Sequence, residues 1–240
     1  MELGKFLVFL LLTGCAGITR APDDFMPITV HATNYDIFTY QKISNPTSPV
    51  HIYIEGDGHA FNGRGMPTDN PTPRGDFVRR LAFQDGGANV VYMARPCQYV
   101  MSDSCNVSDW TDGRFSSAII DSMASAIGSI AKSRPVVLIG YSGGAMIGGL
   151  IAEKYPELNI TNWITIAGVL NHSDWTEYFG DMPLSKSMNL NTLPRVNQMH
   201  YIAKGDTVVP NHLSRKWVGP EKLVVVHGAS HASFPNLKLF

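Results

Sequence analysis

The chain has 240 residues, a length typical of a single domain with one sizeable hydrophobic core. Hydrophobic residues make up 44% of the chain and charged residues 16%, a composition that excludes an intrinsically disordered protein. The formal net charge is -1, so the chain lacks the basic excess that attracts nucleic acid. We therefore expect no nucleic-acid partner, and any substrate must be inferred from a local site.

The first 14 residues have the pattern of an export signal. Lys5 precedes an apolar run at 6–12, which is too short to span a bilayer, because a spanning helix needs about 20 residues. Residues Leu12-Thr13-Gly14-Cys15 resemble the lipobox of bacterial lipoproteins. This resemblance implies cleavage after residue 14, a lipid on Cys15 and a membrane anchor.

The residue after Cys15 is Ala16, whereas Asp at this place is the residue associated with retention in the inner membrane. The resemblance therefore implies an exported protein anchored in a bacterial cell envelope, at the outer membrane or on the periplasmic face. The alternative is an ordinary cleaved signal peptide in which Cys15 has no role.

The remaining chain divides into a short tether and one domain. Residues 15–27 contain two prolines and no hydrophobic period, and we expect a tether there. Residues 28–240 form the domain, which begins with a predicted antiparallel hairpin at 28–31 and 36–43. Apolar runs predict further strands at 50–54, 89–94, 135–139, 162–167, 199–203 and 222–227. Helical patterns lie at 77–83, 116–132 and 143–154.

Apolar strands that alternate with helices predict the α/β class, with a mostly parallel sheet covered on both faces. Sheets of this kind place their active sites at the carboxyl ends of the strands. The candidate catalytic residues of this sequence all follow such strand ends.

The strongest motif is Gly140-Tyr141-Ser142-Gly143-Gly144, between a β-branched strand and a helix rich in small residues. Glycines two positions before and after Ser142 allow strand and helix to approach closely around a sharp turn. Such a turn exposes the serine hydroxyl at the helix N-terminus, which makes Ser142 the candidate nucleophile. The alternative is a glycine-rich turn without chemistry.

A serine hydroxyl needs a base, and the base needs an orienting acid. Asp206 follows the strand at 199–203 in a Gly-Asp-x-x-Val-Pro segment, and His231 follows the last strand. The order Ser, Asp, His and the form of the acid loop resemble the α/β-hydrolase superfamily. Asp174, on the loop after the strand at 162–167, is the competing acid.

The tetrahedral intermediate of acyl transfer needs two N–H donors. Gly143 supplies the first candidate, directly after the nucleophile. The second is the Asp57 amide in Ile54-Glu-Gly-Asp-Gly58, where the superfamily commonly has His-Gly-x and this chain has Glu55. Because a carboxylate beside an oxyanion is unfavourable, we expect the Asp57 side chain to point away and bond its own loop. The alternative is that this segment is simply a tight turn.

Residues from about 28 to 236 resemble a compact α/β-hydrolase with a small cap. Three segments resemble a mostly uncharacterised group of bacterial hydrolases: Ile54 to Gly58, Ala94-Arg-Pro-Cys-Gln-Tyr99 and Trp110-Thr-x-x-Arg114-Phe-Ser116. The cap would lie in 171–194, where aromatic residues fit an acyl or aryl pocket or an ordinary hydrophobic patch. These aromatic residues are Trp175, Tyr178 and Phe179.

Cys97 and Cys105 lie only eight positions apart, and export would place them in an oxidising compartment. We therefore expect them to form a disulfide that stiffens a wall of the pocket. A metal site is the weaker interpretation, because the chain has no CxxC pair and no second ligand cluster. No cofactor or metal is implied by the remaining residues.

The sequence thus predicts an exported serine hydrolase that cleaves a small-molecule or lipid carboxylic ester through an acyl-enzyme. Two alternatives stay open. The same triad cleaves amide or peptide bonds in an amidase or peptidase. A catalytically silent hydrolase fold could also serve as a binding module on the cell surface.

Overall fold

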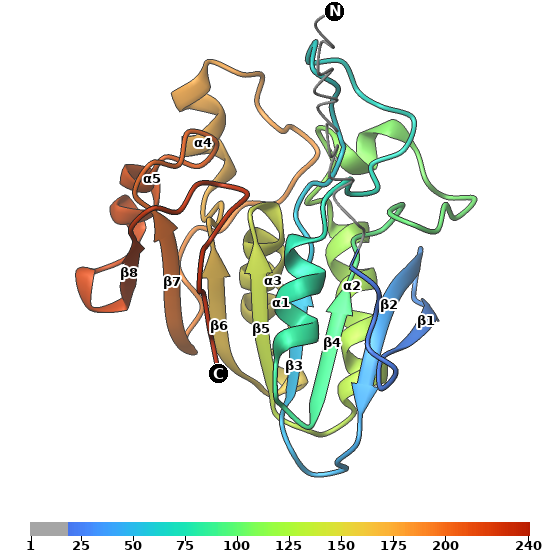
Figure 1. The fold of residues 1–240 in the computed structure, drawn as a ribbon. Helices are drawn as coiled ribbons and strands as arrows, with labels where there is room; N and C mark the ends of the chain where they lie inside the picture. The colour runs from blue at the N-terminus through green and yellow to red at the C-terminus, as the bar shows by residue number, and fades with distance from the viewer. Residues whose placement is uncertain (1–18) are drawn as a thin grey trace, which may run out of the picture.

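The computed structural model describes residues 19–240, so the expected export signal and Cys15 lie outside the described part. Eight strands form one sheet in the order β1-β2-β4-β3-β5-β6-β7-β8 (Figure 1). The strands are β1 (Met26–His31), β2 (Asp36–Ile43), β3 (Val50–Ile54), β4 (Asn89–Met93), β5 (Val136–Tyr141), β6 (Ile160–Ile166), β7 (Asn197–Ala203) and β8 (Leu223–Val226). The α-helices are α1 (Phe77–Gln84), α2 (Ser117–Ala131), α3 (Gly143–Lys154), α4 (His172–Phe179) and α5 (Asn211–Trp217).

The sheet is mostly parallel, as the alternation of strands and helices predicted. β1 and β2 form the expected antiparallel hairpin, and β2 also pairs antiparallel with β4. Every pair from β4 through β3 to β8 is parallel. The carboxyl ends of these strands therefore meet at one edge, where the long loops and α4 also lie (Figure 1).

The strands are apolar throughout because the sheet is buried on both faces. Along β3, Ile52 and Ile54 point into the core formed with α2 and α3, whereas Tyr53 points into the core formed with α1. Figure 1 shows the same division, with α1 on one face of the sheet and α2 and α3 on the other. This alternation follows from the two-residue period of a strand.

The apolar residues of α2 lie on one face, as their helical spacing in the sequence predicted. Its apolar stripe, at Ile119, Met123, Ile127 and Ile130, is buried against the sheet. The Ser116 hydroxyl accepts a hydrogen bond from the Ile119 N–H and caps the helix N-terminus.

Both ends of the described chain pack on the face that carries α1. Phe25 is buried and lies edge-on to Phe83 at the end of α1, with ring centroids 4.9 Å apart. Thr19 donates hydrogen bonds from its N–H and hydroxyl to the Asp76 carboxylate at the start of α1. Phe234 is buried in the same core. Residues 19–25 of the expected tether thus lie against the domain.

Two short helices were not predicted. α4 has eight residues of mixed polar and apolar character, and α5 has seven residues with two basic ones in its last turn. Terminal signals for α4 are present in the sequence, because the Asn171 side chain accepts a hydrogen bond from the Asp174 N–H, and Gly180 ends the helix with φ of 68°. Within residues 19–240 no helix is long and apolar enough to cross a membrane.

Candidate active site

Ser142 lies at a tight turn between β5 and α3. Its backbone has φ of 50° and ψ of -119°, a conformation that L-residues rarely adopt and that costs of order 1–3 kcal/mol. The flanking glycines allow this turn. A β carbon on Gly140 would come within 2.4 Å of the Gly144 carbonyl oxygen, and one on Gly144 within 2.5 Å of the Glu55 carbonyl oxygen.

The structure brings Ser142, His231 and Asp206 together. His231 Nε2 lies 3.0 Å from Ser142 Oγ, and His231 Nδ1 lies 2.9 Å from Asp206 Oδ2. The Tyr141 hydroxyl donates a hydrogen bond to the His231 carbonyl oxygen, which helps to fix the loop after β8. With the Nδ1 proton directed at Asp206, Nε2 is free to accept the serine proton.

The acid loop explains why Asp206 rather than Asp174 faces the histidine. Asp206 is buried, and its Oδ1 accepts hydrogen bonds from the N–H groups of Val208 and Val209, which leaves Oδ2 for His231. Asp174 lies in the first turn of α4 and pairs instead with Lys216 and Trp217 of α5.

A pocket of about 480 Å³ opens above Ser142 and His231. Its wall is mainly apolar and aromatic, and it also contains arginine and carboxylate side chains. The apolar and aromatic lining residues are Phe77, Phe115, Tyr141, Val169, Trp175, Leu184, Val208 and Val209. This volume is in the range of pockets that hold a small molecule.

The loop after β3 lies directly against the Ser142 turn. A β carbon on Gly56 would contact the Ser142 β carbon at 3.2 Å. The loop is held from two sides, because Gln98 donates a hydrogen bond to the Gly56 carbonyl oxygen and the Glu55 side chain accepts one from the Gly56 N–H. Within residues 19–240, the N–H groups of Asp57 and Gly143 donate no hydrogen bond and are available to a ligand.

The expectation for the Asp57 side chain is wrong. Its carboxylate does not bond its own loop but accepts hydrogen bonds from the guanidinium groups of Arg95 and Arg114, and Arg95 also donates to the Arg114 carbonyl oxygen. Burial alone would raise the pKa of Asp57, but Arg114 and Arg95 hold this pKa below its ordinary value. Two buried guanidinium groups thus compensate the charge of one carboxylate.

Glu55 is a second carboxyl group at this loop, and it is fully buried. Burial raises the pKa of Glu55 to about 7, although hydrogen bonds from the Gly56 N–H and the Tyr92 hydroxyl favour the ionised form. Glu55, the residue that departs from the superfamily pattern, therefore ties the loop after β3 to Tyr92 of β4.

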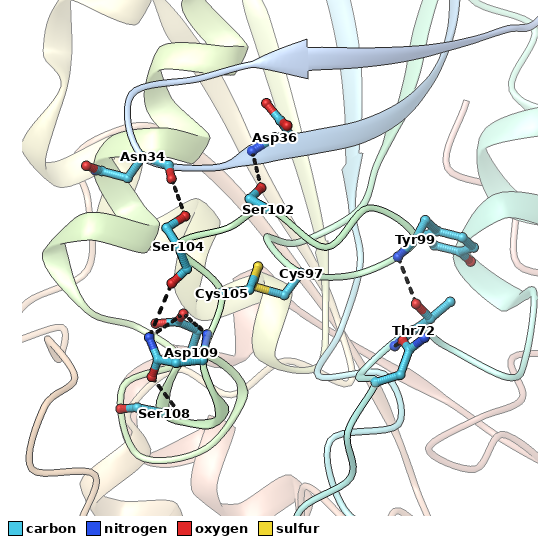
Figure 2. The surroundings of a disulfide bond; sticks show 12 residues. Asn34, Asp36, Thr72, Cys97, Tyr99, Ser102, Ser104, Cys105, Ser108 and Asp109 are labelled. Atoms are coloured by element: carbon cyan, nitrogen blue, oxygen red, sulfur yellow. Dashed lines mark hydrogen bonds between the residues drawn. A yellow bond between two sulfur atoms is a disulfide. The ribbon is translucent and has the colours of Figure 1, made fainter.

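The predicted disulfide between Cys97 and Cys105 is present, with α carbons 5.8 Å apart (Figure 2). It does not lie in the pocket wall, to which the same loop contributes Arg114 and Phe115 instead. The disulfide lies near the β1–β2 hairpin, where Ser102 accepts a hydrogen bond from the Asp36 N–H and Ser104 donates one to the Asn34 carbonyl oxygen (Figure 2).

The cap segment divides its aromatic residues between pocket and surface. Trp175 lines the pocket, and its indole N–H donates a hydrogen bond to the Val208 carbonyl oxygen. Tyr178 and Phe179 lie outside the pocket and are exposed. Of the three aromatic residues, only Trp175 is therefore placed to contact a molecule in the pocket.

Sequence reasoning did not assign Arg95 and Arg114 a role at the site. Both residues occur in segments that resemble other bacterial hydrolases, and nothing in their spacing indicates that they meet Asp57. Within the described residues, no group of three or more His, Cys, Asp or Glu side chains is arranged to hold a metal ion.

No protein-family profile and no curated protein sequence matches the chain. Solved structures do resemble it. A serine hydrolase without a lid from Xanthomonas campestris is 16% identical, with a TM-score of 0.54 over 88% of this chain and 87% of its own. A serine hydrolase homologue from Coxiella burnetii is 14% identical, with a TM-score of 0.53 over 86% and 89%.

A serine hydrolase involved in carbazole degradation is 12% identical, with a TM-score of 0.56 over 87% of this chain and 92% of its own. Such low identities establish a shared architecture and no shared substrate. The sheet order, the turn at Ser142 and these neighbours agree: the protein has the fold of the α/β-hydrolase superfamily.

Proposed function

We propose that the protein is an exported serine hydrolase that cleaves carboxylic esters. The observation that carries this proposal is the hydrogen-bonded series from Ser142 through His231 to Asp206. Ser142 and His231 line a pocket of about 480 Å³. The resemblance to several serine hydrolases in solved structures supports the reaction class.

In the proposed reaction, Ser142 Oγ attacks the ester carbonyl carbon while His231 Nε2 takes the hydroxyl proton. Asp206 holds the imidazole in the required tautomer and stabilises its protonated form. His231 then gives the proton to the leaving alcohol, which leaves an acyl group on Ser142. Water deprotonated by His231 releases the acid and restores the serine.

The oxyanion of each tetrahedral intermediate would be bound by the N–H groups of Asp57 and Gly143. Their freedom from other hydrogen bonds within the described chain supports this role. The charge of the Asp57 carboxylate must be compensated, because an unpaired negative charge here would destabilise the oxyanion. Its pairing with Arg95 and Arg114 compensates that charge and fixes the peptide whose N–H is used.

The pocket supports an uncharged acyl or aryl ester as the substrate class, because apolar atoms make up most of its exposed surface. The same groups could cleave an amide, so a panel of esters and matched amides with increasing acyl length is the test of bond type. We expect turnover of esters, and faster turnover of amides would overturn the ester assignment.

We also propose that the protein is attached to the cell envelope through a lipid on Cys15. The lipobox-like segment at 12–15 supports the lipid attachment, and the disulfide between Cys97 and Cys105 supports an oxidising compartment. Cys15→Ser should move the protein from the membrane fraction to the soluble fraction. Unchanged fractionation would refute the anchor.

A fluorophosphonate probe tests the nucleophile directly. We expect covalent labelling of the wild-type protein and of Ser185→Ala, a control at an exposed serine outside the pocket. Ser142→Ala should lose the label while its circular dichroism and melting temperature stay close to wild type. Labelling of folded Ser142→Ala, or an inert wild-type protein, would overturn the proposed mechanism.

A further inference from the structure

Large apolar side chains gather outside the pocket, around its mouth. Met182 is 84% exposed, Tyr178 52% and Phe179 41%. They belong to a set that we call the apolar rim. The apolar rim consists of Phe61, Trp175, Tyr178, Phe179, Met182 and Val208.

The apolar rim is continuous. The Phe179 ring lies 5.3 Å from Trp175 and 4.9 Å from Tyr178, and the Trp175 indole is bonded to the Val208 backbone. Phe61, Trp175 and Met182 line a second hollow of about 380 Å³ that shares Trp175 with the wall of the main pocket. A patch of this kind on one face of a monomer marks an interaction surface.

The described chain begins beside the main pocket. Thr19 is bonded to Asp76, and Asp76 lines the main pocket. Cys15 precedes Thr19 by four positions, so even a fully extended chain keeps the α carbon of the lipidated residue within about 14 Å of the Thr19 α carbon. An anchor at Cys15 therefore keeps the pocket mouth close to the bilayer.

We propose that the apolar rim rests on the lipid bilayer and that the pocket above Ser142 opens toward the membrane, where it takes acyl esters carried by lipids. This inference rests on the proposed anchor and the proposed ester hydrolysis. The rim alone needs only weak affinity, because attachment at Cys15 gives it a high effective concentration at the surface.

The mixed charges around the apolar rim give little electrostatic attraction to a membrane, so we expect the rim to bind lipid mainly through its apolar side chains. Exposed Arg64, Arg74 and Arg80 lie on the loop and helix side of the pocket, and exposed Glu177 and Asp181 lie in the cap segment, so the region carries charges of both signs. We therefore expect vesicle binding that depends little on salt, in contrast to a basic surface, which binds anionic lipid and is released by salt.

The test uses the full chain with Cys15→Ser, which removes the anchor, and phosphatidylcholine vesicles brominated on their acyl chains. Bromine quenches tryptophans that reach the acyl region, and Trp175 is the tryptophan of the rim. We expect quenching in this background and its loss in Trp175→Phe. The apolar run at 6–12 is present in every variant, so differences between variants report the rim.

The double variant Phe179→Ser with Met182→Ser should weaken vesicle binding at least about tenfold, because it removes two large apolar side chains that the proposal buries in the acyl region. Ile43→Ser is the matched control. Ile43 is 42% exposed, close to the 41% of Phe179, but it pairs with Asn89 at the opposite end of the sheet. This control should bind vesicles as its parent does.

Three results would overturn the proposal. These are no quenching of Trp175, equal binding by the rim variant and its parent, or a concentration-dependent dimer that the rim variant converts to monomer without lipid. Labelling of Ser142 by the fluorophosphonate probe in the same samples reports the proposed chemistry separately. If Ser142 is labelled but Trp175 fluorescence is not quenched, the membrane contact is refuted and the proposed hydrolase chemistry stands.

Discussion

The carboxylate of Asp57 occupies the space beside the α carbon of Gly143 in which a side chain would otherwise lie. A β carbon at position 143 would come within 2.1 Å of Asp57 Oδ1 and 3.0 Å of Arg95 Nη1. The two peptide groups that we assign to the oxyanion are thus coupled through one ion-paired side chain.

Gly143→Ala should therefore displace the paired side chains and misplace the Asp57 amide. We expect kcat to fall by about 10²-fold or more, the cost of losing one oxyanion donor, with a smaller change in KM. Gly63→Ala is the control, because a β carbon there meets no atom within 4 Å. Steady-state ester hydrolysis checks this, and full activity of Gly143→Ala would contradict the assignment.

Asp57→Asn should leave Arg95 and Arg114 without their countercharge. We expect the free energy of unfolding at neutral pH to fall by about 2 kcal/mol, less than for a fully buried pair because the Asp57 side chain is 30% exposed. The folded-state pKa of Asp57 is lowered, so the wild-type advantage exists above the ordinary pKa and disappears as pH falls through the lowered one. Urea denaturation at neutral and acidic pH measures both effects, and an advantage that persists in acid would contradict them.

Glu55→Gln should flatten the dependence of stability on pH. In the wild type the pKa of Glu55 is raised to about 7, so the folded state holds a proton that the unfolded state loses near its ordinary value. Stability should therefore decline as pH rises from about 4.5 to about 7, by at most about 3.5 kcal/mol at about 1.4 kcal/mol per pKa unit. The glutamine has no proton to lose, and an equal decline in both proteins would exclude Glu55 as the cause.

Asp206→Asn should reduce kcat by about 10³- to 10⁴-fold, because an asparagine no longer enforces the histidine tautomer that accepts the serine proton. Asp174→Asn is the matched control, since Asp174 pairs with Lys216 and Trp217 and does not contact His231. Rate measurements on both variants decide between the two acids. Loss of activity in the Asp174 variant alone would reverse the assignment.

Replacing Cys97 and Cys105 together by serine should lower the free energy of unfolding by about 2.5 kcal/mol, the loop-closure entropy of so short a loop. The bond lies outside the pocket wall, so kcat at low temperature should change little. Urea denaturation with and without dithiothreitol provides the measurement. If reductant destabilises the serine variant as much as the wild type, the effect does not come from this bond.

The sequence by itself determined the parallel sheet and the members of the site. Apolar strands that alternate with helices leave few other arrangements, and parallel strands bring their carboxyl ends to one edge. Ser142, Asp206 and His231 each follow such an end, so residues 25 to 89 positions apart were predicted to converge, and they do.

Only the tertiary structure decided how the Asp57 carboxylate is compensated and which aromatic residues of the cap face the pocket. Arg95 and Arg114 lie 38 and 57 positions from Asp57, and their pairing depends on the paths of two irregular loops that no hydrophobic period describes. Likewise, Trp175 and Phe179 stand one helical turn apart on α4, yet one lines the pocket and the other is exposed. Side-chain direction and long-range ion pairs are set by packing between distant segments, and local sequence patterns carry no record of that packing.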